Sequence, residues 1–229
     1  MRIALIILAA FLLSSCMPRA EYEAQKQNGA KPAFIIDNPD DEMITLLRGA
    51  MSDNVLYATL IGENGYEMGS SFYLFGAGKT IAELTLPTSN RFFDPLLIKD
   101  RRAASFEWEA NVVKHFGKQN DFELNFIIFS RWHITPFDNF ADINIAFGDG
   151  LSYASEIPYY ERIRWPKRSQ LLNNMSFELA FDMPVEADSG VAELSAVVRL
   201  HHRSGAFGLF NGVHGASNVV AVGLRSRYY

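Results

Sequence analysis

Residues 191–229, VAELSAVVRLHHRSGAFGLFNGVHGASNVVAVGLRSRYY, carry the clearest indication of the fold, because they contain two runs in which apolar and polar residues alternate. A period of two is that of a β-strand, whose successive side chains point to opposite faces. In the first run, one face carries Leu194, Ala196, Val198, Leu200, His202 and Ser204, and the other carries Glu193, Ser195, Arg199 and His201. A histidine and a serine on the apolar face are unusual for a water-soluble enzyme and indicate a face turned toward lipid.

The same alternation recurs along most of the chain after Val55. The further runs are VLYATLIG, SSFYLFGAG, TIAELTLPT, ASFEWEANVVKHF, DFELNFIIFSRW, ADINIAFG and MSFELAFDM. In ASFEWEANVVKHF, for example, Phe106 and Trp108 share one face, and Glu107 and Glu109 share the other. With the two runs near the end this makes about nine candidate strands, so an even number requires two runs to merge or one to be a loop.

Alternation fits both a soluble sandwich and a membrane barrel, because either can have one apolar face. Several runs reach the roughly 9–11 residues that a tilted strand needs to cross a bilayer. Aromatic residues gather at run ends, as in an interfacial girdle, and the terminal run ends on an aromatic. These are Trp132, Tyr159, Tyr160, Trp165, Tyr228 and Tyr229. The sequence therefore predicts an all-β, antiparallel outer-membrane β-barrel of about eight strands, which its own side chains would fill, making a wall rather than a pore.

The first residues read as an export signal. Met1–Leu13 holds one arginine and a short apolar run, and Leu13-Ser14-Ser15-Cys16 resembles the lipobox of bacterial lipoproteins. An ordinary leader with an incidental cysteine is the alternative. We expect residues 1–15 to be a signal peptide, with lipidation at Cys16, residues 16–54 to be a tether with a short helix in DDEMITLLRGAMS, and residues 55–229 to form the barrel. The segment 148–170, GDGLSYASEIPYYERIRWPKRSQ, should project from the barrel rim.

Composition narrows the function classes. The formal net charge is −5, so there is no basic surface for nucleic acid. Cys16 is the one cysteine, which leaves no thiol for a disulfide or a thiolate metal site. The histidines His115, His133 and His201 lack metal-ligand spacing, and we expect neither metal nor cofactor.

The polar faces of the predicted strands should carry side chains that pair with one another inside the barrel. By parity, His201 and the arginines lie on the lumenal side. We expect Arg203, Arg225 and Arg227 to lie in the interior or at the rim and to pair with Glu107, Glu109 or Glu178.

Several segments together resemble a known family. The run LHHRSGAFGLFNGVHGASNVVAVGLRSRY, with FEWEANVVKHFGKQ, FSRW and GLSYASEIPYYE upstream, is similar to the lipid A 3-O-deacylases (PagL type, acyloxyacyl hydrolases). The resemblance spans about Ala104 to the end. It implies an eight-stranded barrel in the bacterial outer membrane, with lipid A or lipopolysaccharide among the outer membrane lipids as partner. It also implies a serine esterase with His202 as general base, Ser204 as nucleophile, and Gly205 and Asn211 as candidates for the oxyanion hole.

The chain departs from this family at the acid. The family has a glutamate a little over a dozen residues after the histidine, whereas this chain has no Asp or Glu after Glu193. The corresponding stretch holds His214, Ala216, Ser217 and Asn218. A serine or an asparagine can orient an imidazole but supplies no charge, and an acid such as Asp142 or Glu161 could come from another segment.

The missing acid keeps two other functions open. One is a catalytically inactive outer-membrane barrel, or a lipid-binding envelope lipoprotein of the same fold. The other is a soluble lipocalin-like binder tethered through Cys16.

Overall fold

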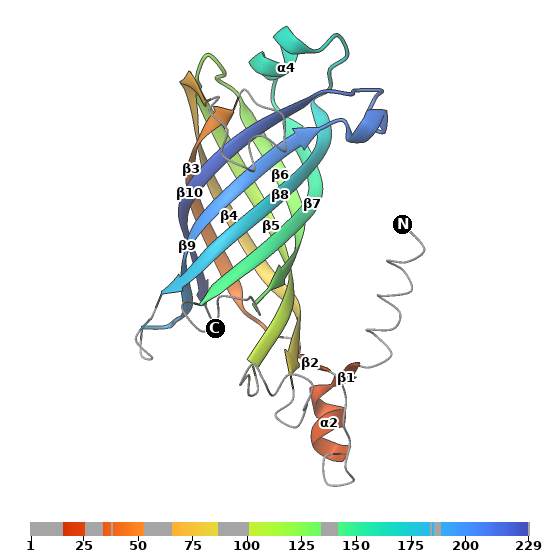
Figure 1. The fold of residues 1–229 in the computed structure, drawn as a ribbon, viewed down its shortest axis with the longest axis vertical. Helices are drawn as coiled ribbons and strands as arrows, with labels where there is room; N and C mark the ends of the chain where they lie inside the picture. Colours follow the sequence, from red (N-terminus) through yellow and green to blue (C-terminus); the bar gives the residue numbers. More distant parts are fainter. Residues whose placement is uncertain are drawn as a thin grey trace.

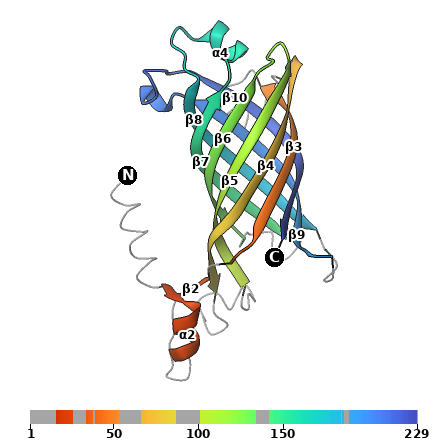
Figure 2. The same cartoon turned by 180° about the vertical axis from the view of Figure 1, so that it is seen from behind.

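The computed structural model describes residues 16–25, 34–37, 39–52, 66–86, 101–133, 142–183, 185 and 189–228. Its main body is a closed antiparallel barrel of eight strands (Figure 1). The strands are β3 (Glu42–Ser52), β4 (Tyr66–Leu86), β5 (Arg101–Gly117), β6 (Phe122–Trp132), β7 (Ile143–Ala154), β8 (Leu171–Met183), β9 (Val191–Ser204) and β10 (Ala216–Tyr228). Their order is β4-β3-β10-β9-β8-β7-β6-β5, and β5 pairs back with β4 to close the wall, which Figure 2 shows from behind.

The predicted alternation is confirmed in the wall. On β5, Glu107 and Glu109 are buried while Phe106 is exposed, and on β6, Glu123 is buried while Phe126 is exposed. Large apolar side chains cover the outside on every barrel strand; examples are Leu46, Phe75, Val112, Leu124, Ile145, Leu179, Val198 and Leu224. A water-soluble monomer exposes no such continuous apolar surface, whereas a barrel in a bilayer requires one. None of the helices in the described ranges has the length and apolar character of a membrane span.

Paired charges fill the lower half of the lumen. Glu178 binds Arg131 and Arg199, at 2.7 Å each, and also Arg225. Glu107 binds Arg131 at 3.0 Å and Arg227 at 2.7 Å, and Glu109 binds Arg199 at 2.6 Å. The predicted pairing is confirmed for Arg225 with Glu178 and for Arg227 with Glu107. It is wrong for Arg203, which lies near the upper rim and binds Glu161 instead. Paired side chains thus occupy this part of the lumen, as is typical of a barrel of eight strands.

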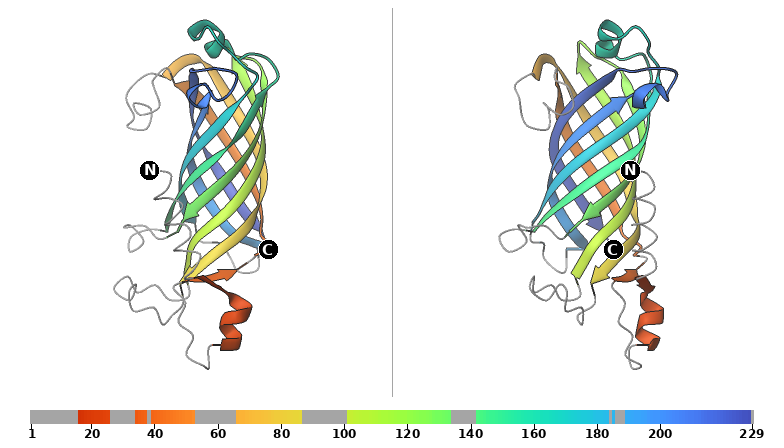
Figure 3. Two further views of the ribbon diagram at one scale, coloured as in Figure 1. Left: turned by 90° about the vertical axis from the view of Figure 1, so that its right-hand side faces the viewer. Right: turned by 45° about the vertical axis from the view of Figure 1, so that its right-hand side comes forward.

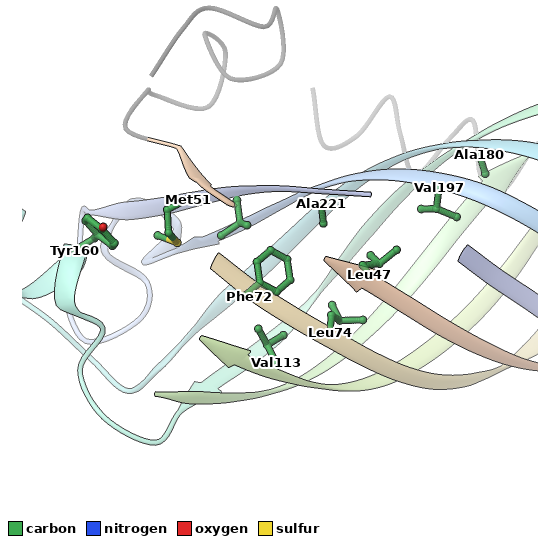
Figure 4. Packing of buried hydrophobic residues seen from close by; sticks show 10 residues of the cluster. Leu47, Met51, Phe72, Leu74, Val113, Tyr160, Ala180, Val197 and Ala221 are labelled. Atoms are coloured by element: carbon green, nitrogen blue, oxygen red, sulfur yellow. The ribbon is translucent and has the colours of Figure 1, made fainter. Parts of the chain in front are cut away.

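An apolar cluster also lies in the lumen, and it extends from the upper rim down to the level of this network. It is formed by inward-pointing side chains that include Leu47, Phe72, Leu74, Val113 and Val197 (Figure 4). The Phe72 ring lies 5.8 Å from the His115 ring and 6.4 Å from the His201 ring. Both imidazoles contact Glu123, at 3.0 Å and 3.2 Å. His115 and His201 are therefore lumenal, as parity predicts.

The segment 42–52 corrects the sequence prediction. It forms barrel strand β3 rather than a short helix, so the barrel begins at Glu42 and not at residue 55. Met43, Thr45 and Leu47 point inward and Ile44 and Leu46 point outward, a period-two pattern that satisfies both faces of the wall. The backbone hydrogen bonds to β4 and β10 outweigh the helical tendency suggested by the acidic residues at the start of this segment.

Two predicted runs merge into β4, which is 21 residues long. Gly76 and Gly78 look like a turn in the sequence, but a Cβ at Gly78 would lie 2.2 Å from the Trp108 carbonyl oxygen. This glycine therefore permits close approach of β5, and the strand continues through it. The run 55–62 and residues 1–15 lie outside the described residues.

Short elements lie at the two ends of the barrel (Figure 3). At the lower end, β1 (Cys16–Pro18) pairs with β2 (Phe34–Asp37), which pairs with β4, and helix α2 (Arg19–Gln25) lies beside them. At the upper rim lie helix α4 (Tyr159–Arg164) and the 3-10 turn η3 (Ala206–Gly208). The predicted excursion is thus confirmed for residues 155–170. Tyr160, predicted in an aromatic girdle, is instead buried, and its hydroxyl contacts Ser70 Oγ at 3.0 Å.

Candidate functional site at the outer wall

The upper part of β9 presents alternate residues to the lumen and to the outside. Arg199, His201 and Arg203 point inward, because their partners Glu109, Glu123 and Glu161 lie inside the barrel or over its mouth. The intervening residues must then point outward. His202 and Ser204 therefore share the outer face with Val198, which is 41% exposed.

His202 is held by an asparagine of the neighbouring strand. Antiparallel pairing sets His202 opposite Asn218 on β10, and the distance from His202 Nδ1 to Asn218 Oδ1 is 2.5 Å. Since the amide oxygen only accepts, Nδ1–H is the donor, and Nε2 is left with its lone pair. This is the tautomer in which an imidazole can take a proton from a hydroxyl at Nε2.

Ser204 ends β9, two residues beyond His202 on the same face. Its Oγ accepts a hydrogen bond of 3.5 Å from the Ala206 N–H. Within the described ranges, no hydrogen bond joins Ser204 Oγ to the His202 ring. His202 is 8% exposed and Ser204 is 9% exposed. The two side chains are thus neighbours on one surface, and proton transfer would require Oγ to turn toward Nε2.

The two predicted oxyanion donors have other partners in this conformation. The Gly205 N–H donates to the Gly215 carbonyl at 3.1 Å, and Asn211 Nδ2 donates to Ser169 Oγ at 2.8 Å. A Cβ at Gly205 would lie 1.9 Å from the Val213 carbonyl oxygen, so close packing of the loop requires glycine there. The oxyanion role of both residues stays a prediction.

The loop that follows Ser204 is strained and apolar. Ala206 and Phe207 have φ of 46° and 58°, a left-handed conformation that is costly for residues with a Cβ. The Phe207 side chain is 98% exposed and that of Leu209 is 82% exposed. The loop that begins after the predicted nucleophile therefore exposes two large apolar side chains.

A single carboxylate ties the inner side of this region together. Glu161 Oε1 accepts hydrogen bonds from Arg203 Nη1 at 2.5 Å and from Ser217 Oγ at 3.1 Å. Arg203 lies between His202 and Ser204, and Ser217 directly precedes Asn218. Burial raises the pKa of the Glu161 carboxyl, and the neighbouring Arg203 guanidinium opposes that rise. Glu161 thus holds β9 and β10 from the lumenal side, through the residues that directly adjoin the outward-pointing site residues in the sequence.

Neither acid considered from the sequence reaches His202. Glu161 is bound to Arg203 on the opposite side of the wall. Asp142 directly precedes β7 at the lower end, where its carbonyl accepts from the Asp182 N–H, whereas Met175 is the β8 partner of His202. The side chain bonded to His202 is Asn218, one of the residues that the sequence offered in place of an acid. Its contact with His202 depends on the β9–β10 register, which the sequence alone left open.

Among the described residues, no group of three histidine, cysteine, aspartate or glutamate side chains is arranged to hold a metal ion. At the outer wall, an imidazole and a hydroxyl lie on one face, which are the groups of a proton acceptor and a nucleophile. The predicted lipidation of Cys16, which begins β1, stays a prediction.

Comparison with known proteins yields little. No family model matches the chain, and no curated protein matches it. The chain is similar to a solved structure, the outer membrane protein OprG from Pseudomonas aeruginosa, with 13% identity, a TM-score of 0.36, and coverage of 84% of this chain and 97% of that one. Similarity this weak assigns no function.

Proposed function

We propose that this protein is an outer-membrane serine esterase that removes an ester-linked acyl chain from lipid A. The single observation that supports the proposal most is the His202–Asn218 hydrogen bond, which leaves Nε2 unprotonated on the outer face that also carries Ser204. The apolar wall around this pair suits a substrate that shares the bilayer with the enzyme. Lipid A as that substrate rests on the family resemblance of residues 200–228.

The chemistry follows from the roles of the three side chains. His202 Nε2 takes the Ser204 hydroxyl proton as Oγ bonds to the acyl carbonyl carbon, and the tetrahedral intermediate carries an oxyanion. The ester C–O bond then breaks, and Nε2 returns the proton to the departing sugar oxygen. Water, deprotonated by the same nitrogen, releases the fatty acid and restores Ser204.

Asn218 gives this site a distinct character. It fixes the imidazole tautomer, as asparagine does in Cys-His-Asn proteases, but it supplies no negative charge to stabilise the imidazolium. We therefore expect a slower enzyme than one with a carboxylate at this position. The oxyanion would be held by backbone N–H groups of the Gly205–Gly215 loop once the substrate displaces their present partners.

The test is the mass of lipid A from cells that express the protein. The proposal expects loss of one hydroxyacyl chain with the wild type, and no loss with Ser204→Ala. Ser226→Ala, an outward-facing serine near the far end of β10, is the matched control and should behave like the wild type.

An inactive barrel is the second candidate. It is favoured by the occupied Gly205 N–H and Asn211 amide, and by the fact that no acid among the described residues bonds to His202. Unchanged lipid A from cells whose protein shows the heat-modifiable gel mobility of a folded barrel would overturn the esterase and support this alternative.

A further inference from the structure

A second lipid-facing feature lies on the wall formed by β10, β3, β4 and β5. It is a groove of about 600 Å³ lined mainly by outward apolar side chains and bounded by two cations, Arg48 and Lys114. The volume lies within the range of pockets that hold small ligands, about 300–1,000 Å³. It is separate from the proposed esterase residues, none of which lines it.

Strand register aligns the cations. Val222, Arg48, Tyr73, Lys114 and Phe122 are successive partners across β10, β3, β4, β5 and β6, so they form one row on the outer face. With neighbouring strands about 4.8 Å apart, Arg48 and Lys114 lie about 10 Å apart on either side of Tyr73. The row is on the upper-rim side of the groove, because β3 runs from Glu42 at the lower end to Ser52 at the upper one.

The next row toward the lower end is wholly apolar. It consists of Leu224, Leu46, Phe75, Val112 and Leu124, each about half exposed. Below it, the partners Ala77 and Ala110 are small. These two alanines lie between the exposed side chains of Ile44 and Phe126. The surface therefore passes from positive charge to large apolar side chains and then to a shallow strip between two of them, which matches a lipid headgroup followed by its acyl chain.

Across the part of the chain that the structure describes, no carboxylate pairs with Arg48 or Lys114. The Arg48 guanidinium lies 5.7 Å from the Tyr73 ring centre, and Lys114 Nζ lies 4.2 Å from the Phe122 ring centre and donates to Asn120 Oδ1 at 2.9 Å. By contrast Lys79, on the outer face of β4 near the lower end, pairs with Asp40. Unneutralised cations at the top of an apolar groove complement an anionic headgroup.

We propose that Arg48, Tyr73 and Lys114 bind the phosphate of an anionic lipid of the surrounding leaflet, whose acyl chain lies in the groove over Leu46, Phe75 and Leu224. The site is independent of ester hydrolysis. It would hold a phosphate-bearing lipid beside the barrel whether or not Ser204 is reactive.

The test uses spin-labelled lipids with the full-length protein in phosphatidylcholine bilayers. Electron paramagnetic resonance measures the fraction of labelled phosphatidylglycerol, relative to labelled phosphatidylcholine, that the protein immobilises. The wild type should prefer phosphatidylglycerol. Each cation should contribute roughly fivefold to the relative affinity for this lipid, so the double variant Arg48→Ala with Lys114→Ala should lose the preference. Lys79→Ala, the paired cation, should leave it unchanged.

Two further arms separate the alternatives. Leu224→Trp, which fills the groove and keeps both cations, should lower the immobilised fraction of phosphatidylglycerol if the acyl chain occupies the groove. Millimolar inorganic phosphate should not displace the labelled lipid. A preference that survives the double substitution, or one abolished by free phosphate, would overturn the proposal.

Discussion

The two faces of β9 and β10 differ in how completely their polar groups are satisfied. On the inner face, Arg199, Arg225 and Arg227 each bind glutamates, within a lumen whose charges are held by several partners. On the outer face, and counting only residues that the structure describes, His202 bonds to Asn218 and Ser204 Oγ accepts one long contact from the Ala206 N–H. Groups held by several ion pairs stabilise a structure, whereas a sparsely bonded histidine and serine retain the freedom that chemistry requires. Substitutions on the two faces should therefore affect different properties.

The largest effect is expected on the inner face. Glu178→Ala removes the carboxylate shared by Arg131, Arg199 and Arg225 and leaves three cations in the lumen. Removing one partner of a buried ion pair costs about 3–5 kcal/mol. Urea unfolding followed by gel mobility should show a loss of this size, with Glu42→Ala at the exposed lower rim as control. A Glu178→Ala variant as stable as the wild type would show that the ion-pair network does not stabilise the barrel.

Asn218 gives the matching test on the outer face. Asn218→Ala should lower deacylation about 10²-fold, because the imidazole loses its fixed tautomer, and should change stability little. Asn218→Asp adds the missing charge and should raise the rate at least about tenfold above the wild type. The rate of fatty-acid release from lipid A in mixed micelles measures both. Equal rates in all three proteins would rule out Asn218 as the orienting group.

Glu161 connects the two faces. Glu161→Gln should leave the free energy of unfolding near neutral pH within about 1 kcal/mol of the wild type, because its amide oxygen can still accept from Arg203 and Ser217. Burial raises the pKa of Glu161 above its ordinary value of 4.5, so the unfolded state ionises first and wild-type stability falls as pH rises from 4.5 through the raised pKa.

The stability of the Glu161→Gln variant should not fall over this pH range. Urea unfolding at a series of pH values compares the two proteins. Profiles of the same shape would mean that Glu161 does not titrate in the way its burial implies.

The smallest effect is expected from the exposed loop. Phe207→Ser with Leu209→Ser should reduce activity on lipid A in bilayers about three- to tenfold, since about 1.5 kcal/mol of transfer energy per side chain is partly lost. Activity on a short-chain soluble ester should be unchanged, because neither side chain touches the site residues. A parallel loss on both substrates would indicate that the loop supports the fold instead of contacting lipid.

The wall of the barrel follows from the sequence, because period two fixes which side chains face lipid and which face the lumen. The pairing of Arg199 with Glu109 is foreseeable for the same reason, since both must point inward. Strand β3 was missed because its acidic start and spaced apolar residues also fit a helix, and only pairing with β4 and β10 decides between them. The partner of His202 depends on the length of the loop between β9 and β10, and alternation alone does not give that register.

Reaction with an alkyl fluorophosphonate tests the central claim most directly, because the reagent forms a covalent bond only with a hydroxyl that a neighbouring base activates. The folded protein in detergent should gain one phosphonyl group on the peptide that contains Ser204, with release of fluoride, and His202→Ala should abolish it. Peptide mass spectrometry reports both. No adduct on the folded wild-type protein, or an adduct that His202→Ala leaves unchanged, would contradict an active serine and histidine on the outer wall.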